Sequence, residues 1–193
     1  TKRILENKGN SKKYLQTLVS QNLNYEVFVF DESRFGTHSR IGHGWFKTGT
    51  RAEVKKKLGY QNFYVYGAVS PKTGDSFSLI IPNVAVTWMN KFLEEFSFNL
   101  KSKKAILVMD QAGWHKSLDL IIPQNIKIIY LAPYSPELNP AEKFWQFIKD
   151  NILKNTIYDT LTELEEKLCT FINSITTKQI LSVCNVNYMP YYL

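Results

Sequence analysis

Residues 25–31 of the chain read YEVFVFD, a short run of aromatic and β-branched side chains that ends on Asp31. Residues 105–110 read AILVMD and repeat this arrangement, with Asp110 as the final residue. Short apolar runs rich in Val, Ile and Phe are typical of buried strands. The two stretches therefore predict two core strands, and each strand leads into a carboxylate.

The remaining pattern predicts an α/β fold in which helices flank a mixed five-stranded sheet. After 25–31, the expected elements are strands 63–69 and 77–81, a helix at 87–100, strand 105–109, a short helix around 116–122, strand 126–131, a helix from Pro140 to about Lys154 and a helical unit from Thr160. Turn residues between the second and third strands indicate a hairpin. Three antiparallel strands followed by alternating helices and strands give a sheet with helices on its faces.

Composition favours a folded domain with a polyanionic partner. Of the 193 residues, 44% are hydrophobic and 14% aromatic, which is enough to bury a substantial core. The net charge of +7 favours nucleic acid as the partner, and the alternative is surface charge that only maintains solubility. Cys169 and Cys184 lack metal-ligand spacing, which argues against a zinc site and fits a reducing compartment. No apolar run approaches the roughly 18–20 residues of a membrane span.

A third acid, Glu142, lies three residues after Asn139, where the stretch 134–145 (YSPELNPAEKFW) predicts the start of a helix. Acids at strand ends and at a helix start can converge on one point from distant parts of a chain. Carboxylate oxygens are the ligands that Mg²⁺ and Mn²⁺ prefer, and pairs of such ions catalyse phosphoryl transfer. On a basic chain, the trio of Asp31, Asp110 and Glu142 therefore indicates a divalent metal site and a phosphodiester substrate.

Each of the three acids also has a structural explanation. Asp31 could be an exposed acid that ends a strand, and its neighbour Glu32 competes for the same role. Asp110 could be a turn residue. Glu142 occupies the third position of a helix capped by Asn139, where Glu often closes a capping box and is favoured by the helix dipole. Taken one at a time, the acids fit structural roles more often than catalytic ones.

Other side chains are candidates for contact with DNA or phosphate. His115, shortly after Asp110, could approach a phosphate or a metal-bound water, or could equally be a packed residue at a helix start. Basic residues upstream could follow a phosphate backbone or form a solvated surface; they are Lys47, Arg51, Lys55 and Lys56. Nearby aromatic residues could stack on unpaired bases, although core packing is the more frequent role; they are Trp45, Phe46 and Tyr60.

Three sequence blocks resemble the signatures of the DDE transposases of the mariner superfamily, in its bacterial insertion-sequence branch. The blocks are FDES at 30–33, VMDQAGWH at 108–115 and PYSPELNPAE at 133–142, and YGAV at 66–69 resembles a further segment of the family. The third block is the most specific of them. The resemblance covers roughly residues 25–155.

This resemblance implies a ribonuclease H-like fold and a division of the chain. Residues 25–155 would be the DDE catalytic domain. The polar residues 1–24 would be a linker or the remnant of a preceding DNA-binding region, and 156–193 a C-terminal helical extension packed on the domain.

The resemblance also implies an activity. Asp31, Asp110 and Glu142 match the metal-binding acids of the family, which hold two Mg²⁺ ions, with Mn²⁺ as a substitute. The implied reaction is cleavage of a DNA strand at a transposon end, followed by strand transfer to target DNA. A homodimer would carry it out on two ends, in the cytoplasm and on the bacterial nucleoid.

Some features depart from the family pattern. Only 31 residues separate Asp110 from Glu142, which is fewer than the resemblance leads us to expect. Gln111 stands where Asn is commoner, Ala141 stands where a larger aliphatic residue is commoner, and no N-terminal helix-turn-helix is recognisable. Two alternatives stay open: a ribonuclease H-like nuclease that never joins strands, and an inactive remnant that only binds DNA.

Overall fold

The computed structural model describes most of the chain, and some segments lie outside this description. The described residues are 17, 21, 22, 24–43, 45, 47–49, 53, 56–115, 117–131 and 139–185. Most of the predicted linker 1–24 and residues 133–138 of the third sequence block fall outside them, as do Arg51, Lys55 and Phe46.

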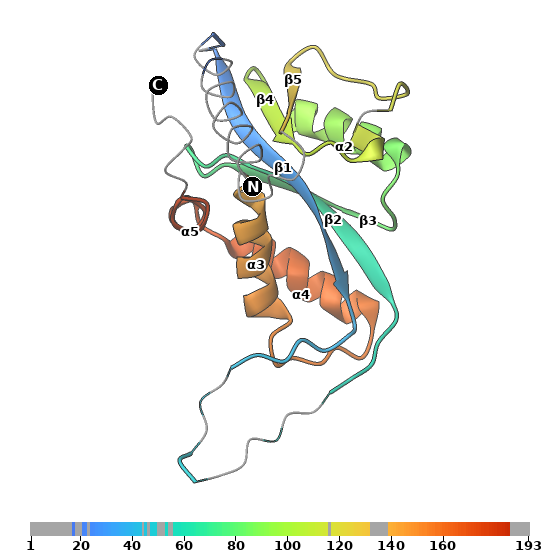
Figure 1. The fold of residues 1–193 in the computed structure, drawn as a ribbon, viewed down its shortest axis with the longest axis vertical. Coiled ribbons are helices and arrows are strands. Elements are labelled where there is room, and N and C mark those ends of the chain that lie inside the picture. Colours follow the sequence, from blue (N-terminus) through green and yellow to red (C-terminus); the bar gives the residue numbers. More distant parts are fainter. Residues whose placement is uncertain are drawn as a thin grey trace, which may run out of the picture.

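A mixed five-stranded sheet runs through the centre of the molecule (Figure 1). Its strands in chain order are β1 (Tyr25–Gly36), β2 (Asn62–Val69), β3 (Ser76–Ile81), β4 (Lys104–Met109) and β5 (Ile126–Tyr130). The spatial order is β3-β2-β1-β4-β5, with antiparallel pairing from β1 to β3 and parallel pairing of β4 with both β1 and β5. This arrangement confirms the predicted sheet and makes β1 its central strand.

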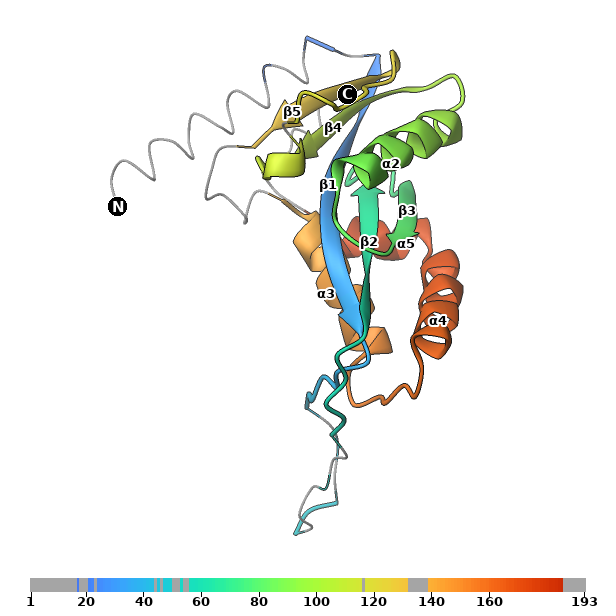
Figure 2. The same cartoon turned by 90° about the vertical axis from the view of Figure 1, so that its right-hand side faces the viewer.

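Helices cover both faces of the sheet, with α2 on one face and three helices on the other (Figure 2). They are α2 (Val86–Asn99), α3 (Ala141–Ile152), α4 (Leu161–Ser174) and α5 (Thr177–Val183). Successive side chains of a strand point to opposite faces, so β1 contributes to both cores. The ring of Phe30 packs against Phe92 of α2, whereas Val29 lies in the core with α3. None of the described helices is both long and apolar enough to cross a lipid bilayer.

The central strand β1 is longer than the predicted strand 25–31. Pairing with β2 continues it to Gly36, because the residues after Asp31 keep the alternation of buried and exposed side chains that suits a strand with one face on the core. Pairing with β4 ends earlier, at Val29 with Val108. Asp31 therefore lies inside β1, just after the point where this strand separates from its parallel neighbour.

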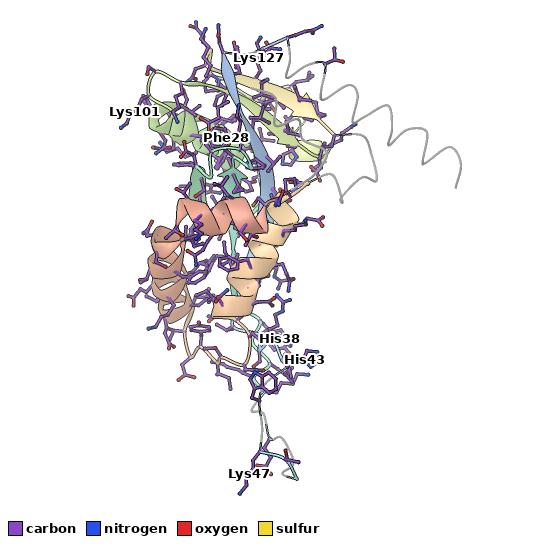
Figure 3. The ribbon with its side chains drawn as sticks, turned by 90° about the vertical axis from the view of Figure 1, so that its left-hand side faces the viewer. Phe28, His38, His43, Lys47, Lys101 and Lys127 are labelled. Atoms are coloured by element: carbon purple, nitrogen blue, oxygen red, sulfur yellow. The ribbon has the colours of Figure 1, made fainter. Side chains whose placement is uncertain are left out.

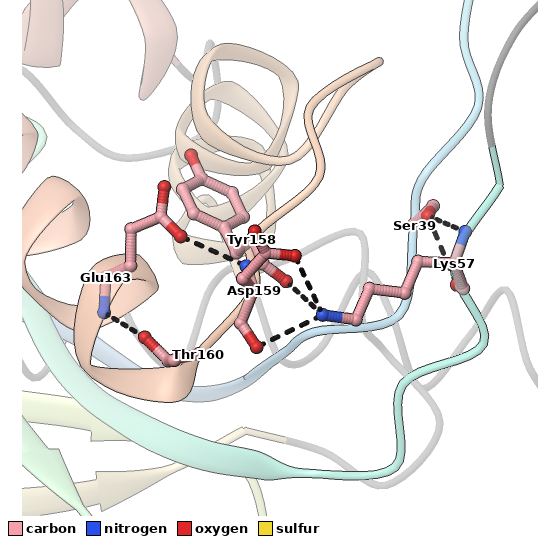
Figure 4. Close-up of polar contacts among 6 residues, drawn as sticks. All are labelled: Ser39, Lys57, Tyr158, Asp159, Thr160 and Glu163. Carbon is pink, nitrogen blue, oxygen red and sulfur yellow. Dashed lines mark hydrogen bonds and ion pairs between the residues drawn. The ribbon is translucent and has the colours of Figure 1, made fainter.

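The C-terminal helices share the core of the sheet. Buried side chains of α4 and α5 lie in one cluster with Val29 of β1; they are Leu164, Leu168 and Ile180. Helix α4 begins after Thr160, as predicted, and the Thr160 hydroxyl accepts a hydrogen bond from the N–H of Glu163 at 3.1 Å (Figure 4). The described part of 156–193 is therefore built into the main core.

The predicted short helix around 116–122 does not form in the described residues of that stretch. The chain makes one turn of 3₁₀ helix, η1 (Gly113–His115), and then continues as a loop. The side chain of Asn90 on α2 holds this loop, because it donates to the carbonyl of Asp119 at 2.9 Å and accepts from the N–H of Ile121 at 2.8 Å. Ile121 is exposed, so burial of apolar side chains does not favour a helix there.

Candidate active site

Two of the predicted acids occupy equivalent positions on neighbouring parallel strands. Val29 of β1 pairs with Val108 of β4. Asp31 and Asp110 each follow two residues later along their strands. Asp110 comes directly after β4 with its side chain 61% exposed, whereas Asp31 is half-buried. The two acids can converge only if their strands are neighbours in the sheet, and β1 and β4 are paired.

Glu32, the acid next to Asp31, points to the other face of the sheet. Asp31 follows Val29 in the alternation of the strand and faces α3. Glu32 follows Phe30 and faces α2. The Phe30 ring meets the imidazole of His115 edge-on at 5.3 Å, and Nε2 of His115 lies 3.6 Å from Oε2 of Glu32. Alternation along one strand therefore separates the surroundings of the two adjacent acids.

Glu142 is exposed in the first turn of α3, and the packing of this helix sets its place. The indole of Trp145 lies on Gly67 of β2, where an added Cβ would meet Cη2 of Trp145 at 2.5 Å. Gly67 is the residue that pairs with Asp31, so the bare glycine backbone lets α3 approach this part of β1. The predicted cap at Asn139 is wrong by one residue: Pro140 is the N-cap of α3 and makes no side-chain capping bond, so Glu142 is the second residue of the helix and not the third.

The charges of the three acids act on one another. Burial and the charge of Glu32 raise the pKa of Asp31 from 3.8 to about 7, and smaller contributions come from Glu142 and Asp110. Both of these acids therefore lie within electrostatic reach of Asp31. Within the part of the chain that the structure describes, no three His, Cys, Asp or Glu side chains are grouped closely enough to hold one metal ion as they stand. The donor atoms are all carboxylate oxygens, which is the chemistry that a hard divalent cation requires.

His115 is buried between two carboxylates. It is 1% exposed, and its Nδ1 lies 2.7 Å from Oδ1 of Asp110, while Nε2 faces Glu32. Burial lowers the pKa of His115, but Glu32 and Asp110 outweigh this effect, so the pKa rises overall. Asp110 also accepts from the N–H of Ala112 at 3.0 Å, which is the predicted turn role. The ring has no exposed face for a phosphate, so the structure favours the packed role over the predicted phosphate contact.

A cation that the sequence pattern did not point to, Lys149, lies within electrostatic reach of Asp31, and Arg40 lies beside it. Lys149 follows Glu142 by seven residues on α3 and is half-buried. Burial and the nearby Arg40 lower the pKa of Lys149, whereas Asp31 acts in the opposite direction. Arg40 donates to Oε1 of Gln146 on the same helix at 3.0 Å. The seven-residue spacing, two turns of one helix face, was the available signal for Lys149, whereas only the tertiary structure places Arg40 there.

The basic segment between β1 and β2 extends away from the sheet (Figure 1), and Lys47 lies at its far end (Figure 3). Lys47 and Lys56 are exposed, while Arg51 and Lys55 lie outside the described residues. The prediction of core packing is wrong for two of the aromatic residues in this segment, which are exposed; they are Trp45 and Tyr60. The described part of the segment therefore presents cations and aromatic rings to solvent.

The base of this segment is fixed to the connection between α3 and α4 (Figure 4). Nζ of Lys57 donates to the carbonyls of Tyr158 and Asp159, at 2.8 and 3.1 Å. The two limbs of the segment pair with each other, because the N–H of Ser39 donates to the carbonyl of Lys57 at 3.0 Å. Lys57 therefore serves as an anchor, although it stands in the basic run.

Comparison with known proteins gives a family match over most of the chain. The family model described as DDE superfamily endonuclease matches residues 26–165. The uncharacterized protein y4pE/y4sA of Sinorhizobium fredii (strain NBRC 101917 / NGR234) is 37% identical over 113 residues, which are 58% of this chain and 84% of that protein. An uncharacterized 39 kDa protein of insertion element IS630 from Shigella sonnei is 24% identical over 156 residues, which are 78% of this chain and 46% of that protein.

Solved structures with the same fold include those of Mos1 transposase. The Mos1 paired-end complex with the left transposon end has a TM-score of 0.73 at 14% identity, covering 95% of this chain and 59% of that chain. A Mos1 mariner paired-end complex with Mn has the same TM-score and coverage at 13% identity. This likeness confirms the predicted ribonuclease H-like fold. The chain spans less than two thirds of the Shigella sonnei protein and of these Mos1 chains.

Proposed function

Since the chain belongs to the DDE superfamily endonucleases, we propose that it is the catalytic domain of an insertion-sequence transposase, which cleaves a DNA strand at a transposon end and joins it to target DNA. The observation that carries the proposal is the approach of three acids from separate elements; they are Asp31 in β1, Asp110 after β4 and Glu142 in α3. The relative from an insertion element and the transposase fold support it. The net charge of +7 fits a DNA partner.

Asp31, Asp110 and Glu142 would hold the divalent cations, two Mg²⁺ ions for which Mn²⁺ can substitute. These residues fit a divalent cation, because Mg²⁺ and Mn²⁺ prefer carboxylate oxygens and because a cation would relieve the repulsion between the acids. Mos1 complexes have been solved with Mn and with Mg. When bound, two such ions activate the attacking oxygen and stabilise the leaving oxygen of a phosphoryl transfer.

The chain's own residues would hold the site and its substrate in place. Ala112 and His115 fix the orientation of the Asp110 carboxylate through hydrogen bonds to Oδ1. Lys149 would bind a non-bridging phosphate oxygen, and its partial burial strengthens this attraction because the local dielectric is lower than in water. In the first step, water attacks the phosphodiester at the transposon end and a 3′-hydroxyl leaves. In the second step, this hydroxyl attacks a phosphodiester of the target strand, so that a new phosphodiester forms to the target 5′ side and the target 3′-hydroxyl leaves.

The segment between β1 and β2 would follow the DNA backbone away from the acids. The cations proposed for this contact are Lys47, Arg51, Lys55 and Lys56, of which Lys47 and Lys56 are exposed in the structure. The exposed rings of Trp45 and Tyr60 suit stacking on unpaired bases. The homodimer and the location in the cytoplasm and on the nucleoid stay predictions.

A cleavage and joining assay on the purified chain tests the proposal. One substrate is supercoiled plasmid with Mn²⁺, and the other is a labelled duplex with a free 3′-hydroxyl, which would join to the plasmid. Asp110→Asn should abolish both nicking and joining. The matched control is Asp119→Asn, an exposed acid on the loop after η1 whose side chain lies outside the proposed site. Activity that survived in Asp110→Asn would refute the assignment.

The same assay separates the two alternatives. A ribonuclease H-like nuclease would nick the plasmid without forming joined products. An inactive remnant would bind DNA and do neither, and calorimetric titration with Mn²⁺ would then show no binding.

A further inference from the structure

Asn139 lies in the turn before α3, and its side chain forms hydrogen bonds with the backbone next to two of the acids. It is 7% exposed. Its Nδ2 donates at 2.9 Å to the carbonyl of Phe30, the residue before Asp31. Its Oδ1 accepts at 3.0 Å from the N–H of Ala141, the residue before Glu142. One amide side chain therefore joins the backbone of the strand that carries Asp31 to the backbone of the helix that carries Glu142.

The bond to β1 is made where the sheet opens. Pairing between β1 and β4 ends at Val29 with Val108, and the carbonyl of Phe30 lies one residue beyond this last pair. The Asn139 side chain, 109 positions away in the sequence, supplies the hydrogen bond at this point. A buried carbonyl without a partner is costly, so the bond ties α3 to the opened end of the strand.

Helix capping alone does not account for this side chain. Ser, Thr or Asp can also accept from an N–H at the start of a helix. Asn adds a second atom that donates, so it can accept from Ala141 and donate to Phe30 at the same time. Aspartate has no donor when ionised, and serine is too short to keep both contacts.

We propose that Asn139 is a positioning residue that sets Glu142 against Asp31 and thereby controls the affinity of the site for divalent metal. The inference rests on the proposed function, because it takes these acids as the metal ligands. Side chains that orient metal ligands typically change metal affinity by about 10–100-fold when they are removed. Both described hydrogen bonds of the Asn139 side chain go to the backbone of the residue before an acid, which is why we assign it a positioning role.

Calorimetric titration of the full chain with Mn²⁺ measures this control. Asn139→Ser keeps an acceptor for the start of α3 and loses the bond to β1, whereas Asn139→Ala loses both. Both variants should bind Mn²⁺ about 10–100-fold more weakly than the wild type. A matched control is Asn125→Ser, because the Asn125 side chain also joins two elements through both of its amide atoms, to Ser97 of α2 at 2.7 and 3.2 Å. This control should leave the Mn²⁺ affinity unchanged.

A double-mutant cycle shows whether the effect passes through Glu142. In a Glu142→Gln background, Asn139→Ser should cause no further loss of Mn²⁺ affinity, because residues that act as one unit are not additive. If Asn139 had a purely structural role, Asn139→Ser would lower the Mn²⁺ affinity by the same factor in the wild-type and in the Glu142→Gln background. Wild-type affinity in Asn139→Ser, or additive losses in the cycle, would overturn the inference.

Hydrogen exchange on the metal-free protein separates this inference from the proposed function. The N–H groups of residues 142–144 bond to the carbonyls of Asn139 and Pro140 in the first turn of α3. They should exchange at least about tenfold faster in Asn139→Ser and at the wild-type rate in Asn125→Ser. Unchanged exchange would overturn the positioning role of Asn139. A wild-type chain that bound no Mn²⁺ would instead refute the proposed function, and the exchange rates would still decide whether Asn139 fixes α3.

Discussion

The adjacent acids Asp31 and Glu32 point to opposite faces of the sheet, so their side chains have different neighbours. Asp31 and Glu32 follow each other in the sequence, and both were candidates. The alternation of β1 turns Asp31 toward the face of α3. Burial and the charge of Glu32 raise the pKa of Asp31 most, and Glu142 and Asp110 raise it further. The same alternation turns Glu32 toward the buried ring of His115. The direction of each side chain follows from the strand pattern, but the partner on each face does not.

The stability of the metal-free protein should depend on pH through Asp31. Its pKa is about 7 in the folded protein and 3.8 in the unfolded chain. The folded state therefore binds the proton more tightly, so this contribution to the free energy of unfolding is complete below pH 4 and is lost as the pH rises through 7. The full loss is on the order of 4 kcal/mol.

Asp31→Asn removes this pH dependence. In the presence of EDTA, the variant should gain stability over the wild type by about 2–3 kcal/mol more at pH 8 than at pH 5. Urea unfolding at both pH values measures this difference, with Asp119→Asn as the control. An advantage of Asp31→Asn that stayed constant from pH 5 to pH 8 would contradict the raised pKa.

Lys149 should contribute one phosphate contact. Lys149→Ala is expected to weaken DNA binding and to reduce the slope of log affinity against log salt by about one. Fluorescence anisotropy of a labelled duplex over a series of KCl concentrations, in EDTA to prevent cleavage, measures this slope. Lys143→Ala is the control, because Lys143 is an exposed cation of the same helix that bonds to the carbonyl of Asn185. An equal slope for the two variants would argue against a specific role for Lys149.

At the scale of elements, α3 and its contact with β2 determine where the third acid lies. The helix itself was predictable, because its apolar residues recur at helical spacing after Pro140. Its approach to the sheet was not, since that depends on the absence of a side chain at Gly67, a residue far away in the sequence. The second half of β1 was missed for a related reason: partner strand β2 stabilises it, and its own residues are only partly apolar.

Gly67→Ala should displace α3. The added methyl group would lie 2.5 Å from Cη2 of Trp145, so either the indole or the helix must move. Overpacking of this kind costs about 1–3 kcal/mol of unfolding free energy. DNA cleavage should fall as well, because Glu142 lies on the same helix. Adding Trp145→Phe, a smaller ring, should recover part of the stability in urea unfolding; a double variant less stable than either single variant would contradict this explanation.

At the scale of the whole molecule, the chain folds around one sheet with two faces. The α2 face is closed by one helix, and the other face requires α3, α4 and α5 together. The residues assigned to a C-terminal extension are thus needed to cover the face on which Asp31 lies. We therefore expect α4 and α5 to unfold together with the sheet.

Leu164→Ala tests this cooperativity. Leu164 of α4 is fully buried in the core that contains Val29 of β1. The variant should lose about 2–5 kcal/mol of unfolding free energy in one transition, and circular dichroism and tryptophan fluorescence should report the same midpoint. Ile121→Ala, at an exposed position, should change stability by less than about 0.5 kcal/mol. A separate early transition confined to helical signal would show that the extension folds on its own.

The order of the strands and of the long helices could be predicted from the sequence, and the three acids are its prediction for the site. These are local properties: short apolar runs, helical spacing and an acid at a fixed offset are visible without a partner. The tertiary structure was needed to show that β1 continues past Asp31, that His115 is buried between carboxylates, and that Lys149 lies within electrostatic reach of Asp31. Each of these depends on contacts between residues distant in the chain, and such contacts arise when separate elements pack against one sheet.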